Sequence, residues 1–169
     1  MADDGVFGLE IVTPEQSLFA GGATAVVLAT SEGDLTVLDG HTPLVGDLVP
    51  GEVRVEQPDG AQLRLAVHGG FLQVDTSPGA AAGLADGDGP LPGLSTRVTV
   101  LAGVAELSEE IDVPRAELAR EAAGQRLTDL GAGRGPVGED TEEDVELAEA
   151  ESALARAELR IEVASGGGS

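Results

Sequence analysis

Residues 31–45 read Ser-Glu-Gly-Asp-Leu-Thr-Val-Leu-Asp-Gly-His-Thr-Pro-Leu-Val, and this stretch is the most informative part of the sequence. Two short apolar pieces in it flank a turn that contains Asp39, Gly40, His41 and Pro43. Asp39-Gly40 supplies the positive φ that a tight reversal needs, and Pro43 fixes the exit of the turn. These residues therefore predict a β-hairpin with one polar histidine at its tip.

Around this stretch, apolar and polar residues alternate with the period of a half-buried strand. The clearest alternating sets are Val53 and Val55; Leu63, Leu65 and Val67; and Val98 and Val100. Turn signals recur at Gly21-Gly22, Ser31 to Gly33, Asp39-Gly40, Pro50-Gly51, Pro58-Asp59-Gly60 and Gly69-Gly70. This spacing predicts roughly nine or ten short strands in an antiparallel β-sandwich of two sheets packed face to face. We expect the sandwich to span residues 1–106.

Residues 76–96 interrupt the strand pattern. Ser77-Pro78-Gly79, Gly87-Asp88-Gly89-Pro90 and Pro92-Gly93 are dense in turn formers, and the segment has few core-forming side chains. We therefore expect a mobile surface insertion between two strands of the sandwich.

From residue 107 to residue 164 the pattern becomes helical. Asp112 is a good N-cap and Pro114 suits the first turn, so a helix should run to about Leu130. Its expected inner face consists of Ala116, Ala119, Ala123, Leu127 and Leu130. After a loop over residues 131–138, Thr141 and Asp144 predict the start of a second helix that reaches about Val163.

The second helix carries a stripe with steps of three and four residues. The stripe consists of Leu147, Ala150, Leu154, Ala157 and Ile161. It predicts an antiparallel two-helix hairpin, which gives the whole chain an α+β fold. Because alanine buries little more than a methyl group, roughly 0.8 kcal/mol per carbon, we expect this hairpin to be able to detach and repack. Residues 165–169 are expected to be a disordered tail.

The composition limits the class of protein. Nine basic residues, all of them arginine, face 31 acidic ones, which gives a formal net charge of −22. This charge argues against a protein that binds nucleic acid or anionic lipid. Cysteine is absent, which excludes disulfides and thiolate chemistry. No apolar run approaches the ~20 residues of a membrane span, and the first residues lack the features of a signal peptide, so we expect a cytosolic protein that meets a membrane only through a partner.

The quoted stretch closely resembles the signature of the epsilon subunit of F-type ATP synthases. The other segments that resemble this family are Val12 to Glu15, Leu18 to Gly21, Pro50 to Arg54, His68 to Leu72, Val98 to Ala102 and Ala153 to Arg160. They occur in family order on the β-then-αα layout. In the family the connection at residues 76–96 is usually a tight hairpin, so the insertion is a departure.

The resemblance implies a non-catalytic subunit of the rotary central stalk, at the cytoplasmic face of the membrane. Its sandwich would dock on the gamma subunit and on the c-ring, which couples rotation to proton-driven ATP synthesis. Its helices would contact the alpha and beta subunits transiently and regulate ATP hydrolysis. Carried over from the family, the c-ring contact residues are Glu32, Gly33, Asp34, His41 and Pro43. The alternative is that these are ordinary solvated turn residues.

A second implied site is regulatory ATP binding in the helical hairpin, with no other cofactor expected. Ile111 to Ala116 matches the family's ATP-binding motif. The implied ligands are Glu106, Asp112, Arg115, Arg156 and Arg160, because Arg forks suit phosphate. The alternative is that Asp112 is only a helix cap and that the arginines balance nearby acids. The acids between Glu139 and Glu151 would also repel a polyphosphate.

Other functions stay open at this point. A free-standing ATP-sensing module would bind ATP as the isolated chain, with Arg115, Arg156 and Arg160 as its discriminating feature. An unrelated β-sandwich with a dimerising helix would not co-purify with a gamma subunit. An enzyme has no support, because no paired acid–base or metal-binding set is evident and no Ser, Cys or second His accompanies His41 in a catalytic pattern.

Overall fold

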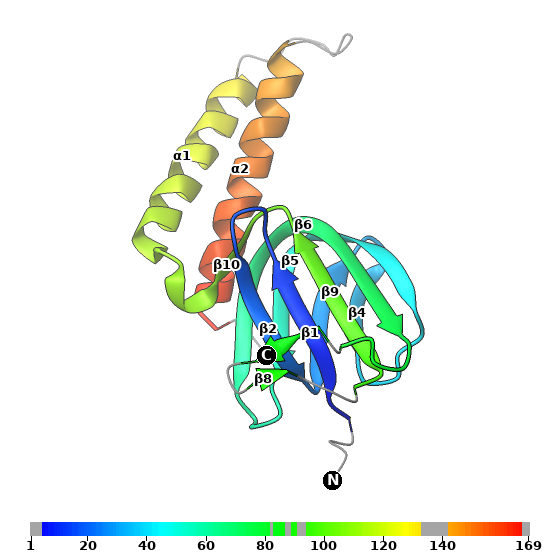
Figure 1. Ribbon diagram of the computed structural model, residues 1–169. Coiled ribbons are helices and arrows are strands. Elements are labelled where there is room, and N and C mark those ends of the chain that lie inside the picture. Colours follow the sequence, from blue (N-terminus) through cyan, green and yellow to red (C-terminus); the bar gives the residue numbers. More distant parts are fainter. Residues whose placement is uncertain (1–4, 82, 87–88, 91–93, 133–141, 167–169) are drawn as a thin grey trace. The chain divides into compact units, whose positions relative to one another are not determined.

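The computed structural model describes residues 5–81, 83–86, 89–90, 94–132 and 142–166. The chain divides into two compact units, Met1–Ser108 and Glu109–Ser169. The division falls two residues after the boundary expected from the sequence. The first unit is a β-sandwich and the second contains two long helices, which confirms the α+β fold class (Figure 1).

The first unit is built almost entirely of strands. They are β1 Phe7–Val12, β2 Ser17–Ala23, β3 Ala25–Thr30, β4 Gly33–Val37, β5 Leu44–Glu56, β6 Gln62–Thr76, β7 Ala85–Asp86, β8 Gly89–Pro90, β9 Thr96–Ala102 and β10 Ala105–Leu107. Eight of them form one sheet in the order β2-β1-β9-β6-β5-β3-β4, with β10 also paired to β6. All pairs in this sheet are antiparallel except β1 with β9, which is parallel.

The expectation of two separate sheets needs correction. Strands β5 and β6 are long, and both halves of each are paired, so they run through both layers of the sandwich. The first half of β6 pairs with β10, and the second half pairs with β9. The sandwich is therefore one continuous sheet that folds over on itself.

Three of the glycine turn signals lie inside strands, so the turns predicted at these positions are wrong. Gly21-Gly22 lies in β2, Pro50-Gly51 in β5 and Gly69-Gly70 in β6. Gly70 has a φ of 145°, and a Cβ atom placed on it would lie 2.1 Å from the carbonyl oxygen of Leu101. A Cβ on Gly51 would lie 2.6 Å from the Cβ of Ala29. These glycines permit a close approach of neighbouring strands instead of ending them.

The core of the sandwich consists of the side chains at every second strand position, which point inward. Its largest fully buried side chains are Phe7, Leu9, Ile11, Leu28, Leu65, Leu72, Val26, Val37, Val53, Val55, Val67 and Val98. The alternation that predicted strands around Val53, Leu65 and Val98 is thus confirmed.

The opening stretch does not form the predicted hairpin. β4 pairs with β3, and β3 lies between β4 and β5, so the two apolar pieces around Asp39-Gly40 are not partners. The turn instead contacts Thr96, the first residue of β9. The hydroxyl of the buried Thr96 donates to the Asp39 carboxylate at 2.8 Å and accepts from the Gly40 N–H at 2.9 Å. Asp and Gly are common both in hairpin turns and in longer connections between strands. The local sequence therefore could not show which of the two structures forms at Asp39-Gly40.

The described part of the insertion is not a free surface segment. Ala81 and Leu84 are buried, and β7 pairs with β8 as a short two-stranded ribbon. Turns closed by hydrogen bonds from Ala80 N to Ser77 O and from Leu84 N to Ala81 O shape its first part. These residues differ from the expected surface insertion because the apolar side chains of Ala81 and Leu84 anchor the segment.

The helical unit contains α1 Val113–Ala132 and α2 Glu142–Ala164. Asp112 caps α1, since its carboxylate accepts the Arg115 N–H at 3.0 Å. The predicted stripe of α2 faces inward, with Ala150 and Ala157 buried. On α1, Ala116 and Ala123 are buried, but Ala119 is exposed, contrary to prediction. Residues 131 and 132 of the predicted loop belong to α1, so the helix ends two residues later than predicted. The rest of that loop, the Thr141 cap and most of the 165–169 tail lie outside the described residues.

Candidate functional site

A groove lies where the β3–β4 turn meets the start of β5. The Thr30 hydroxyl donates to the Gly33 carbonyl at 2.7 Å, and Gly33 has a φ of 121° that closes the turn. The Ser31 N–H donates to the Asp47 carbonyl at 3.3 Å, which ties the turn to β5. We call the resulting feature the rim groove.

The rim groove has a volume of about 510 Å³ and acidic walls. It is lined by Thr30, Ser31, Glu32, Gly33, Asp34, Leu35, Leu44, Val45, Gly46 and Asp47. None of these residues is basic, and the side chains of Glu32, Asp34 and Asp47 are exposed. Val45 is 76% exposed and adds an apolar surface. The groove is thus suited to a side chain with an apolar stem and a positive end.

Only some of the predicted contact residues line the rim groove. Glu32, Gly33 and Asp34 do, whereas His41 and Pro43 do not. The His41 Nδ1–H donates to the Thr42 carbonyl at 2.9 Å, and the His41 backbone N–H donates to the Leu38 carbonyl at 3.1 Å. Asp47 and Val45 line the groove but were missed, because their place beside the β3–β4 turn depends on pairing between distant strands.

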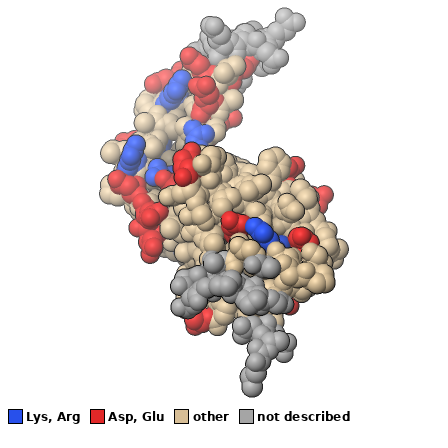
Figure 2. Space-filling view, viewed as in Figure 1, with Lys and Arg blue, Asp and Glu red and all other residues tan. Residues whose placement is uncertain are grey.

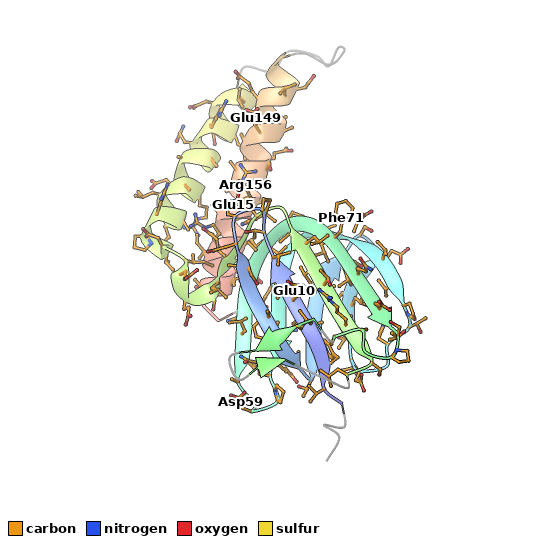
Figure 3. The ribbon with its side chains drawn as sticks, in the orientation of Figure 1. Glu10, Glu15, Asp59, Phe71, Glu149 and Arg156 are labelled. Atoms are coloured by element: carbon orange, nitrogen blue, oxygen red, sulfur yellow. The ribbon has the colours of Figure 1, made fainter. Side chains whose placement is uncertain are left out.

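A second surface feature is an apolar row on the outer face of the sheet. Val12 on β1 lies opposite Leu101 on β9, and Leu101 lies opposite Phe71 on β6. Phe71 is 56% exposed and Leu101 is 47% exposed. Figure 3 labels Phe71, whose side chain projects away from the core. We call these three residues the outer row.

The outer row and the rim groove adjoin each other. Asp47, which lines the groove, is the register partner of Phe71. The sequence carried a signal for the outer row, because positions 71 and 101 are apolar where strict alternation calls for polar residues. A run such as Phe71-Leu72 or Val100-Leu101 fills both faces of a strand, and this marks the outward residue for attention.

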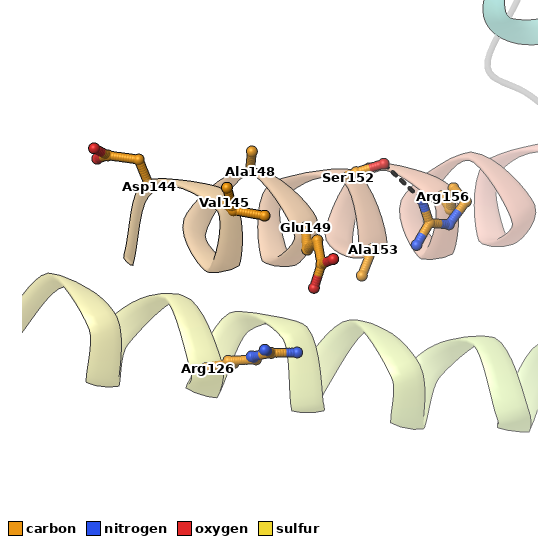
Figure 4. A pocket seen from close by; sticks show the side chains of 8 residues that line it. All are labelled: Arg126, Asp144, Val145, Ala148, Glu149, Ser152, Ala153 and Arg156. Atoms are coloured by element: carbon orange, nitrogen blue, oxygen red, sulfur yellow. Dashed lines mark hydrogen bonds between the residues drawn. The ribbon is translucent and has the colours of Figure 1, made fainter. Parts of the chain in front are cut away.

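The helical unit has its own groove of about 750 Å³ between α1 and α2. Its lining residues are Arg126, Asp144, Val145, Ala148, Glu149, Ser152, Ala153 and Arg156 (Figure 4). The guanidinium of Arg156 donates to the Ser152 hydroxyl. Two arginines and two acids face this groove, so its charge is balanced rather than positive.

The residues expected to bind ATP are only partly brought together. Arg156 lines the helix groove, while Asp112, Arg115 and Arg160 are not among the lining residues. The carboxylate of Asp112 is engaged as the cap of α1. Glu106 lies on β10 in the other unit. Arg126 is the basic residue of the groove that the sequence did not single out.

Two further features, a metal-binding group and a membrane-spanning helix, are absent from the described residues. In the part of the chain that the structure describes, no group of three or more His, Cys, Asp or Glu is arranged to hold a metal ion. Within the same described ranges, no helix is long and apolar enough to cross a membrane.

Comparison with known proteins identifies similar chains. The family model for the ATP synthase Delta/Epsilon chain β-sandwich domain matches residues 6–78, and the model for the long α-helix domain matches residues 109–165. The ATP synthase epsilon chain of Thermobifida fusca is 40% identical over 117 residues, which cover 68% of this chain and 72% of the relative. That of Symbiobacterium thermophilum is 35% identical over 165 residues, which cover 97% of this chain and 94% of the relative.

A solved structure supports the architecture. A chain in the mitochondrial ATP synthase of Euglena gracilis is similar with a TM-score of 0.64 at 22% identity. The alignment covers 90% of the present chain and 78% of the Euglena chain. This likeness concerns the fold, a β-sandwich followed by two helices.

Proposed function

The chain belongs to the family of bacterial ATP synthase epsilon chains, and we propose that it couples rotation of the c-ring to the catalytic head during proton-driven ATP synthesis. It acts in this role by protein contact and catalyses no reaction itself. The observation that carries the proposal is that two exposed surfaces of the sandwich, one apolar and one acidic, adjoin at Asp47. A joint between two partners needs two such surfaces.

The outer row is the proposed docking surface for the gamma subunit. Large exposed apolar side chains that are neighbours on a sheet mark protein–protein contacts more often than scattered ones do. Phe71 and Leu101 are direct cross-strand neighbours, and the face of the sandwich in Figure 2 is largely uncharged. Burial of an aromatic side chain at the centre of such a contact supplies much of the affinity.

The rim groove is the proposed contact for the polar loops of the c-ring. Glu32, Asp34 and Asp47 give it a negative charge, which would steer and orient an arginine-bearing loop. His41 and Pro43 stay predicted contact residues at the neighbouring loop. The subunit would then lie at the cytoplasmic face of the membrane and be held there through the complex.

Replacement of the outer row tests the gamma contact. In the Phe71→Ser/Leu101→Ser double variant we expect co-purification with gamma to fall at least tenfold, because truncating a hot-spot residue typically costs more than ~1 kcal/mol. Leu118→Ser is the matched control, since Leu118 is a 68% exposed leucine on α1. Circular dichroism of each variant checks that the fold is intact. Undiminished co-purification of the double variant would refute this docking surface.

Charge reversal tests the rim groove. We expect the Glu32→Lys/Asp34→Lys variant to assemble but to lose proton-driven ATP synthesis in membrane vesicles, because lysines in the groove repel a basic loop. Glu15→Lys is the control, since Glu15 is an exposed acid in the β1–β2 connection. If synthesis in the rim variant equals that of the control, the rim is not the contact.

Regulatory ATP binding by Asp112, Arg115, Arg156 and Arg160, with Glu106, stays a further proposal. Its support is that Arg156 lines the helix groove from an exposed position of α2, where a ligand in solvent can reach it. Isothermal titration of the chain with ATP tests it, and the Arg115→Ala/Arg156→Ala variant should abolish any measured heat. Absence of binding by the parent chain would leave the joint function intact and remove the nucleotide site.

A further inference from the structure

The described residues 77–81 and 83–86, which we call the strap, pack on the outer face of β1 through Ala81 and Leu84. Ala81 and Leu84 are buried there, and Leu84 is the one large apolar residue of the strap. Their contact is Gly8: a Cβ placed on Gly8 would lie 2.5 Å from the Ala81 Cβ and 2.8 Å from Leu84 Cδ1. The absence of a side chain at position 8 therefore creates the seat for the strap.

The seat lies on the same face of the sheet as the outer row. Along β1, Leu9 and Ile11 point into the core, so Gly8, Glu10 and Val12 point outward. Gly8 is opposite Arg97, Glu10 is opposite Thr99, and Val12 is opposite Leu101. The strap thus occupies one end of the face and the outer row occupies the other.

An ion pair separates these two ends. Arg97 Nη2 donates to Glu10 Oε2 at 2.7 Å, and the Nε atom of Arg97 is buried. In Figure 2 a basic side chain flanked by acidic ones marks the sandwich face, and Figure 3 labels Glu10 in the same view. Covering this pair with a partner would remove charged groups from water, which opposes docking unless new partners replace it.

We propose that the strap permanently covers the Gly8 end of the outer face and confines the docking partner to the outer row. The inference rests on the proposed docking of gamma at Val12, Leu101 and Phe71. The strap covers this part of the sheet in place of a partner. The Glu10–Arg97 ion pair marks the limit of the area that the partner contacts. The surface that the gamma subunit can contact is consequently narrower than the sheet beneath it.

Hydrogen exchange of the free chain tests the seat. In Gly8→Ala the added methyl collides with the Ala81 Cβ, so the strap amides should exchange at least tenfold faster, with β5 and β6 unchanged. Gly46→Ala is the matched control, because a Cβ there meets only Leu44 Cδ1 at 3.7 Å and the strand keeps an ordinary φ. If the strap amides exchange equally slowly in both variants, the strap does not depend on packing against Gly8.

Cysteine labelling in the assembled complex tests the confinement. The chain has no cysteine, so Leu101→Cys, Phe71→Cys and Ser77→Cys each give a single reporter. Between the free chain and the ATP synthase complex, labelling at positions 71 and 101 should fall at least tenfold, while labelling at the exposed position 77 should stay within twofold.

The outcomes separate the two proposals. Protection of position 77 together with 71 and 101 means that the partner covers the strap, which overturns the confinement and leaves the docking function standing. Undiminished labelling at 71 and 101 overturns the docking function, and the confinement with it. In that case the exchange experiment still decides whether the strap is seated on Gly8.

Discussion

The sandwich and the helical unit bury side chains of very different size. Phe7, Leu9 and Ile11 on β1 are fully buried in the sandwich, as are many Val and Leu residues around them. In the helical unit most buried side chains are alanines, Ala116, Ala123, Ala150 and Ala157, and the larger buried ones are Ile111 and Val163. A buried Leu or Phe contributes about 1.5–3 kcal/mol and a methyl about 0.8 kcal/mol. The sandwich is therefore the stable scaffold, and the helix pair is held more weakly.

The largest effect should come from the place where the sheet folds over. In Gly70→Ala the new Cβ would meet the Leu101 carbonyl oxygen at 2.1 Å, at a φ of 145° that other residues rarely adopt. We expect the sandwich to lose about 3–5 kcal/mol of unfolding free energy, measured by urea denaturation. Gly103→Ala, where the nearest atom is 4.0 Å away, is the control and should change stability little. Similar urea midpoints of unfolding for both variants would show that the backbone at position 70 can move to accommodate the methyl group.

A matched pair of leucine truncations measures the contrast directly. Leu72→Ala leaves a cavity in the fully buried sandwich core and should cost about 2–5 kcal/mol. Leu154→Ala removes a partly buried side chain from the α2 stripe and should cost about 1 kcal/mol. Hydrogen exchange resolved by segment assigns each loss to its unit. If the second change costs as much as the first, the helix pair is not the weaker element.

Loss of the α1 cap should have a smaller effect that stays within the helical unit. Asp112→Ala removes the acceptor for the Arg115 N–H and should destabilise the helix by about 1 kcal/mol. Circular dichroism at 222 nm during thermal melting reports the change. Glu117→Ala, at an exposed position in the same helix, serves as the control. A cap that matters no more than Glu117 would mean that packing alone sets the start of α1.

Removal of the second helix should change ATP hydrolysis least. The resemblance to the family implies that a helix in this position would inhibit hydrolysis through basic residues. Here Glu146, Glu149, Glu151, Glu158 and Glu162 are exposed on α2, with only two arginines beside them. We expect deletion of residues 131–169 to raise the ATPase activity of the purified complex little. A several-fold increase would contradict this and would make the helix pair an effective brake.

The local sequence pattern was enough to predict the strands and helices, but it was not enough to predict which strands pair. The alternation at Val53 and Val98 and the cap at Asp112 depend on neighbouring residues only, so they could be predicted. The crossing of Asp39-Gly40 to Thr96 joins residues more than fifty positions apart, and a turn-forming dipeptide carries no record of its distant partner. The prediction at Gly70 was wrong for the same reason, since its need for glycine comes from Leu101 on another strand.

The candidate site divides in the same way. Glu32, Gly33 and Asp34 are consecutive, so their common place at the β3–β4 turn could be predicted from the sequence. Asp47 and Val45 join them only through the pairing of β3 with β5, and the outer row needs the register of three strands. The strap was misjudged because its two apolar anchors depend on an empty position at Gly8.

The passage of β5 and β6 through both layers has a mechanical meaning. Twisting force applied to one layer travels into the other along covalent backbone, and not only across side-chain contacts. The layers cannot shear past each other without breaking strand ladders that they share. A block of this construction transmits torque stiffly, so strain during rotation would collect in the flanking connections and leave the block itself undeformed.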